Sequence, residues 1–84
     1  MTHKILYTES ALKDVKKLDP IVKKRVGAKI VLYSSNPLLY SKRLTNSLTG
    51  SYRWRVGSYR IIFDIKNETI IVLRIRHRRE IYKT

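Results

Sequence analysis

The sequence predicts an α+β fold, in which an N-terminal strand and an antiparallel helical hairpin pack on a small, mainly antiparallel four-stranded sheet in the order β-α-α-β-β-β. Two patterns predict this class. Apolar residues recur at helical spacing between residues 9 and 35, and from Ser51 onward they alternate with polar residues at a period of two. The length of 84 residues adds a third observation, because it suits one small domain over residues 1–84.

The first strand and the first helix are predicted over residues 3–18. Residues 3–7 form a short strand. Thr8 can cap the helix that follows, with Glu9 near the positive end of the helix dipole. The apolar stripe expected on this helix consists of Leu12, Val15 and Leu18.

A second helix is predicted between Asp19 and Asn36. Asp19 is a suitable N-cap and Pro20 a suitable first-turn residue, and the helix ends at Asn36 because the residue before a proline disfavours helical backbone. Since the link between the two helices is short, we expect an antiparallel hairpin. Its expected buried face consists of Val22, Val26, Ile30 and Tyr33.

Residues 36–50 are predicted to be a loop, and a β-hairpin follows. A two-residue turn at residues 57–58 pairs Arg55 with Arg60 and so fixes the two faces of the hairpin. The core face then carries Tyr52, Trp54, Val56, Tyr59, Ile61, Phe63 and Ile65. The other face carries Arg53, Arg55 and Arg60.

The last strand is predicted over residues 69–76, after a three-residue turn at residues 66–68. This register places Arg74 and Arg76 beside the other arginines, whereas a two-residue turn would bury Arg74 at a high cost. The residues expected to face the core are Ile71, Leu73 and Ile75. Those expected beside the arginines, exposed until a partner covers them, are Ile62, Ile70 and Val72. The chain can end in one helical turn over residues 77–82.

The charge of the chain points to a polyanionic partner. Nineteen Lys and Arg against six Asp and Glu give a net charge of +13, which is large for a small folded domain. Eight of the ten lysines precede residue 51, whereas seven of the nine arginines follow it. Because guanidinium grips phosphate in a fixed two-pronged geometry, the second half is the predicted binding half.

The composition disfavours several other classes of protein. There is no cysteine, and two histidines at opposite ends with six scattered acids do not suit a metal site. The chain shows no Gly-rich phosphate loop, no apolar run of membrane-spanning length and no signal peptide. We therefore expect no metal, no small-molecule cofactor, no membrane association and a cytoplasmic location.

The residues allow RNA to be cleaved without a metal ion. The 2′-hydroxyl of RNA attacks the adjacent phosphorus once a base removes its proton, and clustered arginines stabilise the charge that develops. The candidate catalytic residues are Arg60, His77, Arg78 and Tyr82. The candidate RNA-binding residues are Arg53, Arg55, Arg74, Arg76 and Arg79. His77 is also compatible with a packed position on the core side of the last strand.

The second half of the chain resembles a known family. The segments YRWRVGSYRIIFDI, which starts at Tyr52, and IIVLRIRHRREIY, which ends at Tyr82, resemble the RelE/ParE superfamily of type II toxins, as does the order of the predicted elements. The resemblance covers nearly the whole chain. It implies a ribosome-dependent messenger RNase that cleaves in the ribosomal A site and is neutralised by a cognate antitoxin.

The resemblance also implies which residues act. RelE-type toxins carry two basic residues on the first hairpin strand, an arginine on the next, an arginine after the last strand and a C-terminal tyrosine. The matching residues are Arg53, Arg55, Arg60, Arg78 and Tyr82. The family pattern assigns transition-state stabilisation to arginine, protonation of the leaving group to Arg78, and substrate orientation or stacking to Tyr82.

One departure from the family bears on the mechanism. Some active members have lysines at the positions of Arg53 and Arg55, and one of those lysines is proposed as the general base. Arginine stays protonated and is a far poorer base. Either His77 or Tyr82 takes that role here, or the activity is lower, or this member acts differently.

Two other functions are compatible with the sequence. ParE-type toxins share the fold, lack an intact RNase constellation and inhibit DNA gyrase. A non-catalytic nucleic-acid-binding module would explain the charge, but not why His77 and Tyr82 flank Arg78. For the RNase, the expected partners are a cognate antitoxin, through an amphipathic and acidic helix or strand, and the ribosome with its mRNA, through the basic surface.

Overall fold

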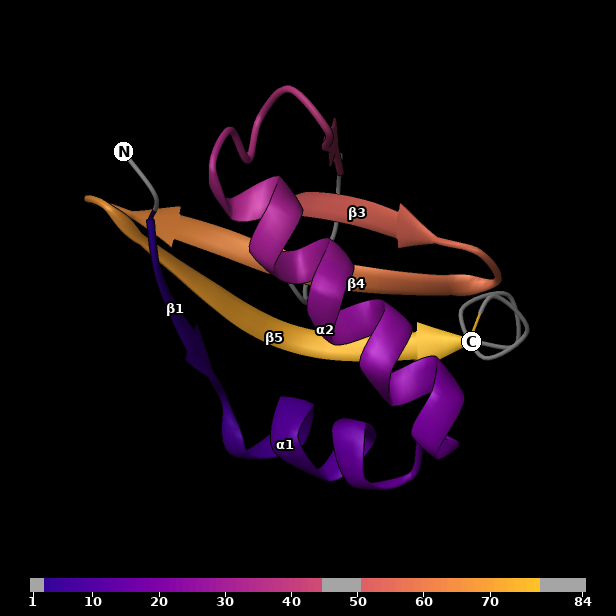
Figure 1. Ribbon diagram of the computed structural model, residues 1–84. Coiled ribbons are helices and arrows are strands. Elements are labelled where there is room, and N and C mark those ends of the chain that lie inside the picture. The colour runs from indigo at the N-terminus through magenta and orange to yellow at the C-terminus, as the bar shows by residue number, and fades with distance from the viewer. Residues whose placement is uncertain (1–2, 45–50, 78–84) are drawn as a thin grey trace.

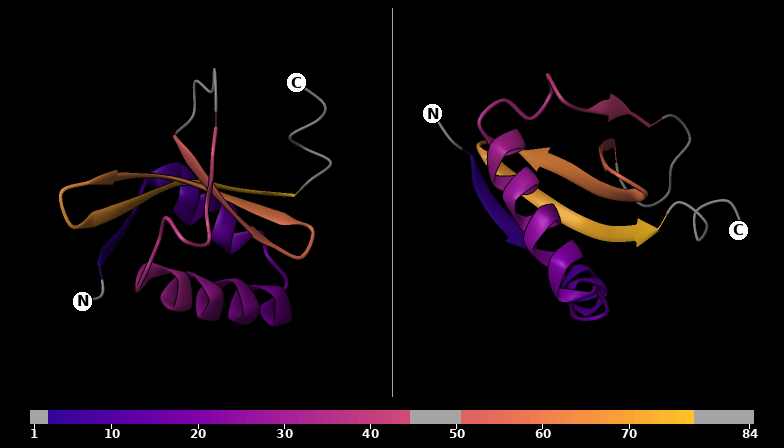
Figure 2. Two further views of the ribbon diagram at one scale, coloured as in Figure 1. Left: turned by 90° about the horizontal axis from the view of Figure 1, so that it is seen from above. Right: turned by 45° about the vertical axis from the view of Figure 1, so that its right-hand side comes forward.

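A twisted five-stranded sheet with two helices packed against it forms the frame of the molecule (Figure 1). The computed structural model describes residues 3–44 and 51–77. Helix α1 (Glu9–Lys16) lies beside β5, and α2 (Pro20–Ser34) crosses one face of the sheet. Seen edge-on, the other face of the sheet has no helix over it within the described residues (Figure 2, left). We call this the open face.

The strands follow the order β1-β5-β4-β3-β2 across the sheet. β1 (Lys4–Tyr7) runs parallel to β5 (Thr69–His77), and the other neighbours, β4 (Tyr59–Lys66), β3 (Tyr52–Val56) and β2 (Lys42–Arg43), pair antiparallel. The predicted α+β class and the mainly antiparallel sheet are confirmed. The sheet has one strand more than predicted, because β2 lies in a segment expected to be a loop.

Both helices begin where the sequence predicts. The hydroxyl of Thr8 accepts the backbone N–H of Ala11 at 3.1 Å and caps α1. Asp19 occupies the N-cap position of α2, but its side chain makes no capping hydrogen bond. Pro20 stands in the first turn, where its missing N–H costs nothing.

The buried face of α1 is rotated from the predicted one. Val15 and Leu18 pack into the core as expected, but Leu12 is about half exposed. Ala11 and Asp14 are buried in its place. The predicted stripe is therefore wrong at Leu12, and an acidic side chain stands on the packed side of the helix.

The core lies between α2 and the sheet. The indole N–H of Trp54 donates to the carbonyl of Pro37 at 3.0 Å, and its ring stacks on Phe63 with ring centres 4.0 Å apart. Both aromatic side chains are fully buried. The residues of α2 that cover them or pack beside them are the predicted ones, Val22, Val26, Ile30 and Tyr33.

The two hairpin turns differ in how well they were predicted. Residues 57–58 form the expected two-residue turn, and Arg55 faces Arg60 across it. The turn between β4 and β5 also has two residues rather than three, since Lys66 pairs with Thr69. Asn67 supplies the positive φ of 58° that a tight turn needs. The core-facing residues of the first half of β5 are therefore Ile70 and Val72, and not Ile71 and Leu73.

A β-bulge in the middle of β5 restores the predicted faces beyond it. Phe63 pairs with Val72 and Ile62 pairs with Arg74, so Leu73 is left over. The extra residue resets the alternation, and Arg74 reaches the open face although the turn is short. The prediction that a two-residue turn would bury Arg74 is wrong because it assumed a regular ladder.

The exposed apolar surface is not where the sequence predicts it. Ile70 and Val72 are fully buried in the core, and Ile62, although on the open face, is only 8% exposed. Most of the large apolar side chains that are exposed within residues 3–44 and 51–77 lie on α2 or just after it: Ile21, Val31, Leu32, Leu38, Leu39 and Tyr40.

Candidate nucleic-acid interface

The open face carries basic side chains in two rows that cross the strands. In the first row, Arg55, Arg60 and Arg76 are opposed in register on β3, β4 and β5. The second row, read from β2 to β5, consists of Lys42, Arg53, Ile62 and Arg74. Side chains opposed in this way have Cβ atoms about 4.5–5.5 Å apart. The structure thus brings five of the sequence-predicted arginines onto one surface, which we call the arginine face: Arg53, Arg55, Arg60, Arg74 and Arg76.

Arg60 is the centre of the first row and is only 7% exposed. Like charges directly opposite one another destabilise a sheet, and burial adds a desolvation cost to a charged side chain. A row of three arginines therefore concentrates positive charge on the open face, and one member of the row is buried. Such an arrangement is typical of a surface that binds a polyanion, because the ligand then supplies compensating negative charge.

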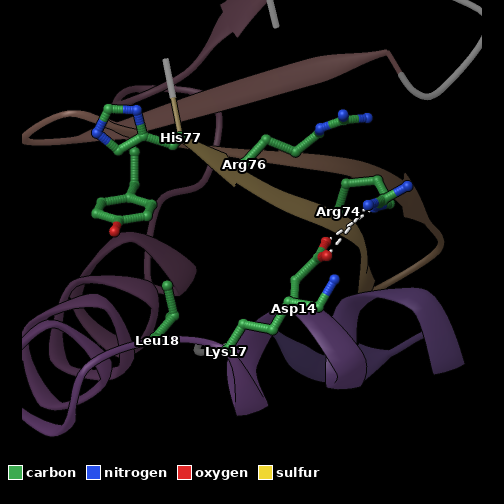
Figure 3. Close-up of a pocket in the computed structure, with 7 residues that line it drawn as sticks. Asp14, Lys17, Leu18, Arg74, Arg76 and His77 are labelled. Atoms are coloured by element: carbon green, nitrogen blue, oxygen red, sulfur yellow. Dashed lines mark hydrogen bonds and ion pairs between the residues drawn. The ribbon is translucent and has the colours of Figure 1, made fainter. Parts of the chain in front are cut away.

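Helix α1 holds one end of the second row. The carboxylate of Asp14 accepts hydrogen bonds from Nε of Arg74 at 2.8 Å and from Nη2 of Arg74 at 3.1 Å (Figure 3). It also accepts the backbone N–H of Ile75 at 2.9 Å. That N–H lies on the edge of β5 beyond the end of β1, whose pairing stops at Val72. Asp14 therefore fixes the Arg74 guanidinium and covers a group at the sheet edge.

The same contacts keep Asp14 ionised. Burial alone would raise the pKa of this carboxyl, but hydrogen bonds from Arg74 and Ile75 and the positive charges of Arg74 and Arg76 outweigh it and hold the pKa below its ordinary value of 3.8. At neutral pH the negative charge of Asp14 therefore compensates the guanidinium that it holds.

A pocket of about 410 Å³ opens at the edge of β5, between this strand and the end of α1. Its lining residues are drawn in Figure 3: Asp14, Lys17, Leu18, Tyr59, Arg74, Arg76 and His77. Arg76 belongs both to the first row and to the pocket. The arginine face therefore continues around the edge of β5 into this pocket.

His77 lies on the other side of β5 from the first row. It is opposed in register to Tyr59, and the two rings meet edge to face with centres 5.1 Å apart. Its side chain is partly buried and lines the pocket. The remaining sequence-predicted candidates, Arg78, Arg79 and Tyr82, lie outside the described residues.

Three residues of this region are absent from the sequence-based candidates: Asp14, Lys17 and Lys42. A signal for Asp14 exists in the sequence, since it lies three residues after Ala11 and four before Leu18, on one helical face. Lys17 is the C-cap of α1, and its place beside β5 follows only from the packing. Lys42 reaches the arginine face through β2, which is too short to show a period.

The same part of the chain lacks the features of a metal site and of a membrane-spanning helix. No group of three or more His, Cys, Asp or Glu residues within residues 3–44 and 51–77 is arranged to hold a metal ion. Neither α1 nor α2 combines the length and the apolar composition that crossing a bilayer requires.

Known proteins are similar to this chain in both sequence and fold. The family model described as the ParE toxin of the type II toxin-antitoxin system parDE matches residues 5–82. Toxin RelG of Mycobacterium tuberculosis is 33% identical over 90 residues, which cover 99% of each chain. The chain belongs to the RelE/ParE superfamily of type II toxins. The resemblance of its hairpin and C-terminal segments to this superfamily is thereby confirmed.

Two further relatives agree with this membership. Toxin RelE3 of Methanocaldococcus jannaschii is 34% identical to this toxin over 85 residues, which cover 94% of each chain. In the crystal structure of the toxin-antitoxin complex RelBE2 from M. tuberculosis, the matching chain superposes with a TM-score of 0.80 at 27% identity, covering 92% of this toxin and 99% of that chain. The fold that presents the arginine face is thus that of a RelE/ParE toxin.

Proposed function

We propose that this toxin is a ribosome-dependent endoribonuclease that cuts messenger RNA in the ribosomal A site and so arrests translation and growth. The observation that carries the proposal is the first row of the arginine face, in which Arg55, Arg60 and Arg76 stand side by side across three strands. A surface of this kind suits a reaction in which negative charge increases on a phosphate.

In the proposed reaction the 2′-hydroxyl oxygen forms a bond to the adjacent phosphorus, and the bond to the 5′-oxygen of the next nucleotide breaks. The products are a 2′,3′-cyclic phosphate and a 5′-hydroxyl. The intermediate phosphorane gathers charge on its non-bridging oxygens, and N–H donors fixed in advance stabilise it without having to reorganise. Arg60 fills this role, because its burial between Arg55 and Arg76 restricts it.

The other arginines hold the flanking backbone. Arg53 and Arg55 on β3 and Arg74 and Arg76 on β5 stand on either side of Arg60 and can each grip a phosphate in a two-pronged hydrogen bond. The ion pair with Asp14 keeps Arg74 in one orientation. Arg79 is proposed to add a further phosphate contact from the C-terminal segment.

The proton of the 2′-hydroxyl needs an acceptor other than arginine. Of the two candidates, His77 lies on the opposite side of β5 from the first row, so we assign the base to Tyr82. The phenol of tyrosine is one of the side chains that can act as a general acid or base in proteins. Arg78 is assigned the protonation of the leaving 5′-oxygen.

We further propose that a cognate antitoxin binds this toxin, because the matching chain from M. tuberculosis belongs to a toxin-antitoxin complex. The apolar side chains exposed on and after α2 include Ile21 and Leu39, and α2 itself carries exposed lysines such as Lys24. An amphipathic and acidic segment complements such a surface. Co-purification with the product of a neighbouring small acidic reading frame tests this partner.

The experiment that tests the RNase is to map the 5′ ends of cellular messages after the toxin is induced. We expect new ends within translated regions, in phase with the codons, and little cutting of naked RNA by the purified toxin. New ends that persist when translation initiation is blocked would contradict the requirement for the ribosome.

A second candidate function is inhibition of DNA gyrase, because the matching family model is that of the ParE toxin. It predicts a different outcome in the same cells. Induction would then leave messages intact, while plasmid supercoiling fails and DNA breaks accumulate.

A further inference from the structure

The pocket at the edge of β5 exists because two neighbouring elements end early. β1 pairs with β5 only as far as Val72, so the last five residues of β5 extend past it. Helix α1 ends at Lys16, and its Asp14 takes the N–H of Ile75. The space of about 410 Å³ that results lies within the range of about 300–1,000 Å³ that is usual for small-ligand sites.

The charges in the pocket favour an anion. Among the residues that the structure describes, Lys17, Arg74 and Arg76 line it together with one carboxylate, that of Asp14. This carboxylate already accepts two hydrogen bonds from Arg74 and one from the backbone of Ile75. The described residues of the lining thus carry three positively charged side chains and one negatively charged side chain. Figure 3 shows Lys17 and Asp14 on one wall and Arg76 and His77 on the other.

The remaining walls are aromatic and apolar. Tyr59 and His77 contribute rings held edge to face, and Leu18 contributes a buried aliphatic side chain. Aromatic side chains give the flat surface on which an unpaired nucleobase stacks, and this holds for every base because each has a π face. A cationic rim beside aromatic side chains suits one nucleotide, its phosphate at the rim and its base inside.

Arg76 connects this pocket to the first row of the arginine face. An RNA backbone that lies along Arg55, Arg60 and Arg76 can continue around the edge of β5 into the pocket. We infer that the pocket between β5 and the end of α1 receives one unpaired nucleotide of the RNA strand bound on the arginine face. This inference rests on the proposed function, and it adds that the substrate is single-stranded beyond the cut, because a base within a duplex cannot enter.

The binding test uses the full chain and a four-nucleotide RNA whose 2′-hydroxyls are methylated, so that it cannot be cleaved. Titration followed by NMR is expected to shift the backbone amides of Lys17, Tyr59 and His77 as well as those of the first row. The affinity of this RNA is compared with that of matched RNAs, each abasic at a different single position. Only one abasic RNA is expected to bind at least about fivefold more weakly, because it alone lacks the base that stacks in the pocket. If every abasic RNA bound as tightly as the complete RNA, the inference would be overturned.

The variant test compares two neighbouring lysines. Lys17→Ala is expected to weaken binding of this RNA several-fold. It is also expected to lower the slope of log affinity against log salt concentration by about one, because one fewer ion is released on binding. Lys16→Ala removes the same charge one residue earlier, from a side chain that does not line the pocket, and is expected to change the affinity by less than about twofold. Equal effects of the two substitutions would show that RNA binding depends on the overall charge and not on the pocket, and would overturn the inference.

The same variants separate this inference from the proposed function. If Arg60→Ala abolishes cleavage of translated messages while Lys17→Ala binds RNA like wild type, the proposed RNase function is supported and the inference about the pocket is contradicted. If the wild-type toxin cuts no messages but Lys17→Ala weakens RNA binding, the inference about the pocket is supported and the proposed RNase function is contradicted. Amide shifts at Lys17 and His77 with an acidic hexapeptide, and none with RNA, would assign the pocket to a protein partner and overturn the inference.

Discussion

The two faces of strands β3, β4 and β5 are made of the same chain segments, yet they have opposite properties. On the side of α2, Trp54, Ile61 and Phe63 are completely buried and exclude water. On the open face, one residue away along each strand, Arg55, Arg60 and Arg76 place three positive charges side by side. The alternation of a β-strand is sufficient to separate them.

This comparison separates the face that stabilises this small toxin from the face to which we assign its function. The core face stabilises the fold by burying apolar side chains, while the arginine face offers a concentrated positive charge to a ligand. Substitutions on the core face should therefore change the free energy of unfolding, and substitutions on the open face should change activity. The four predictions that follow test this division.

The largest effect is expected for Trp54→Ala. The substitution removes the stack on Phe63 and leaves the carbonyl of Pro37 without its indole donor. We expect a loss of about 3–5 kcal/mol in the free energy of unfolding, measured by urea denaturation. A loss below about 1 kcal/mol would contradict the assignment of this face as the core. Arg55, the next residue of β3, lies on the opposite face and is the position there that is compared with Trp54.

The second effect is expected for Arg60→Ala, and it concerns activity. Removal of a fixed donor from the transition state lowers rates by about 10²–10³-fold, so cleavage of translated messages should fall by that factor. Arg25→Ala, an exposed arginine on α2, is the control for loss of charge alone and should retain cleavage. Thermal melts of both variants test that they are folded; full toxicity of Arg60→Ala would refute its role.

The third effect is expected for Asp14→Asn, which joins the two faces because Asp14 projects from the packed side of α1 and binds an arginine of the open face. We expect a loss of about 1–2 kcal/mol at neutral pH, a moderate value because the Arg74 side chain is one-third exposed. Asp19→Asn, at a cap without a side-chain hydrogen bond, is the control and should cost less.

This prediction carries a pH dependence with a definite sign. The pKa of Asp14 is lower in the folded state than its ordinary value of 3.8, so its contribution is complete above that value and is lost as the pH falls through the folded-state pKa. The stability difference between wild type and Asp14→Asn should therefore shrink in acid. A difference that stays constant from pH 7 to pH 3 would contradict the ion pair.

The smallest effect, and the only gain, is expected for Arg55→Gln. Arg55 is exposed and directly opposes Arg60, so its removal relieves repulsion within the first row. We expect the free energy of unfolding to rise by about 0.2–1 kcal/mol at low salt, and the gain to diminish as salt screens the charges. A loss of stability at low salt would show that the row is not repulsive in the free toxin.

The first hairpin and the face of α2 could be predicted because each depends on a local pattern. The alternation from Tyr52 to Ile65 and the glycine at position 57 fix the turn and both faces without any distant contact. Arg55, Arg60 and their neighbours follow from that alternation alone. The residues of α2 that contact the sheet follow from a period of 3.6.

The remaining features depend on contacts between distant segments. Asp14 and Arg74 are 60 residues apart, and the sequence around either residue does not predict the ion pair between them. The strand β2 has only two residues, so its pairing with β3 gives no periodic signal. The bulge at Leu73 has no marker such as glycine, and a three-residue turn with a regular ladder places Arg74 on the same face.

The bulge at Leu73 also bears on how the length of the chain can vary. Leu73 is the one residue of the β4–β5 ladder without a partner, so its deletion would close the bulge and preserve every pair from Tyr59–His77 to Lys66–Thr69. A deletion beyond the bulge, between residues 74 and 77, would exchange the two faces of the rest of the strand. Among related toxins, we therefore expect single-residue gaps in this strand to fall at this position. Leu73 acts as a spacer that allows the turn and the arginine face to diverge independently.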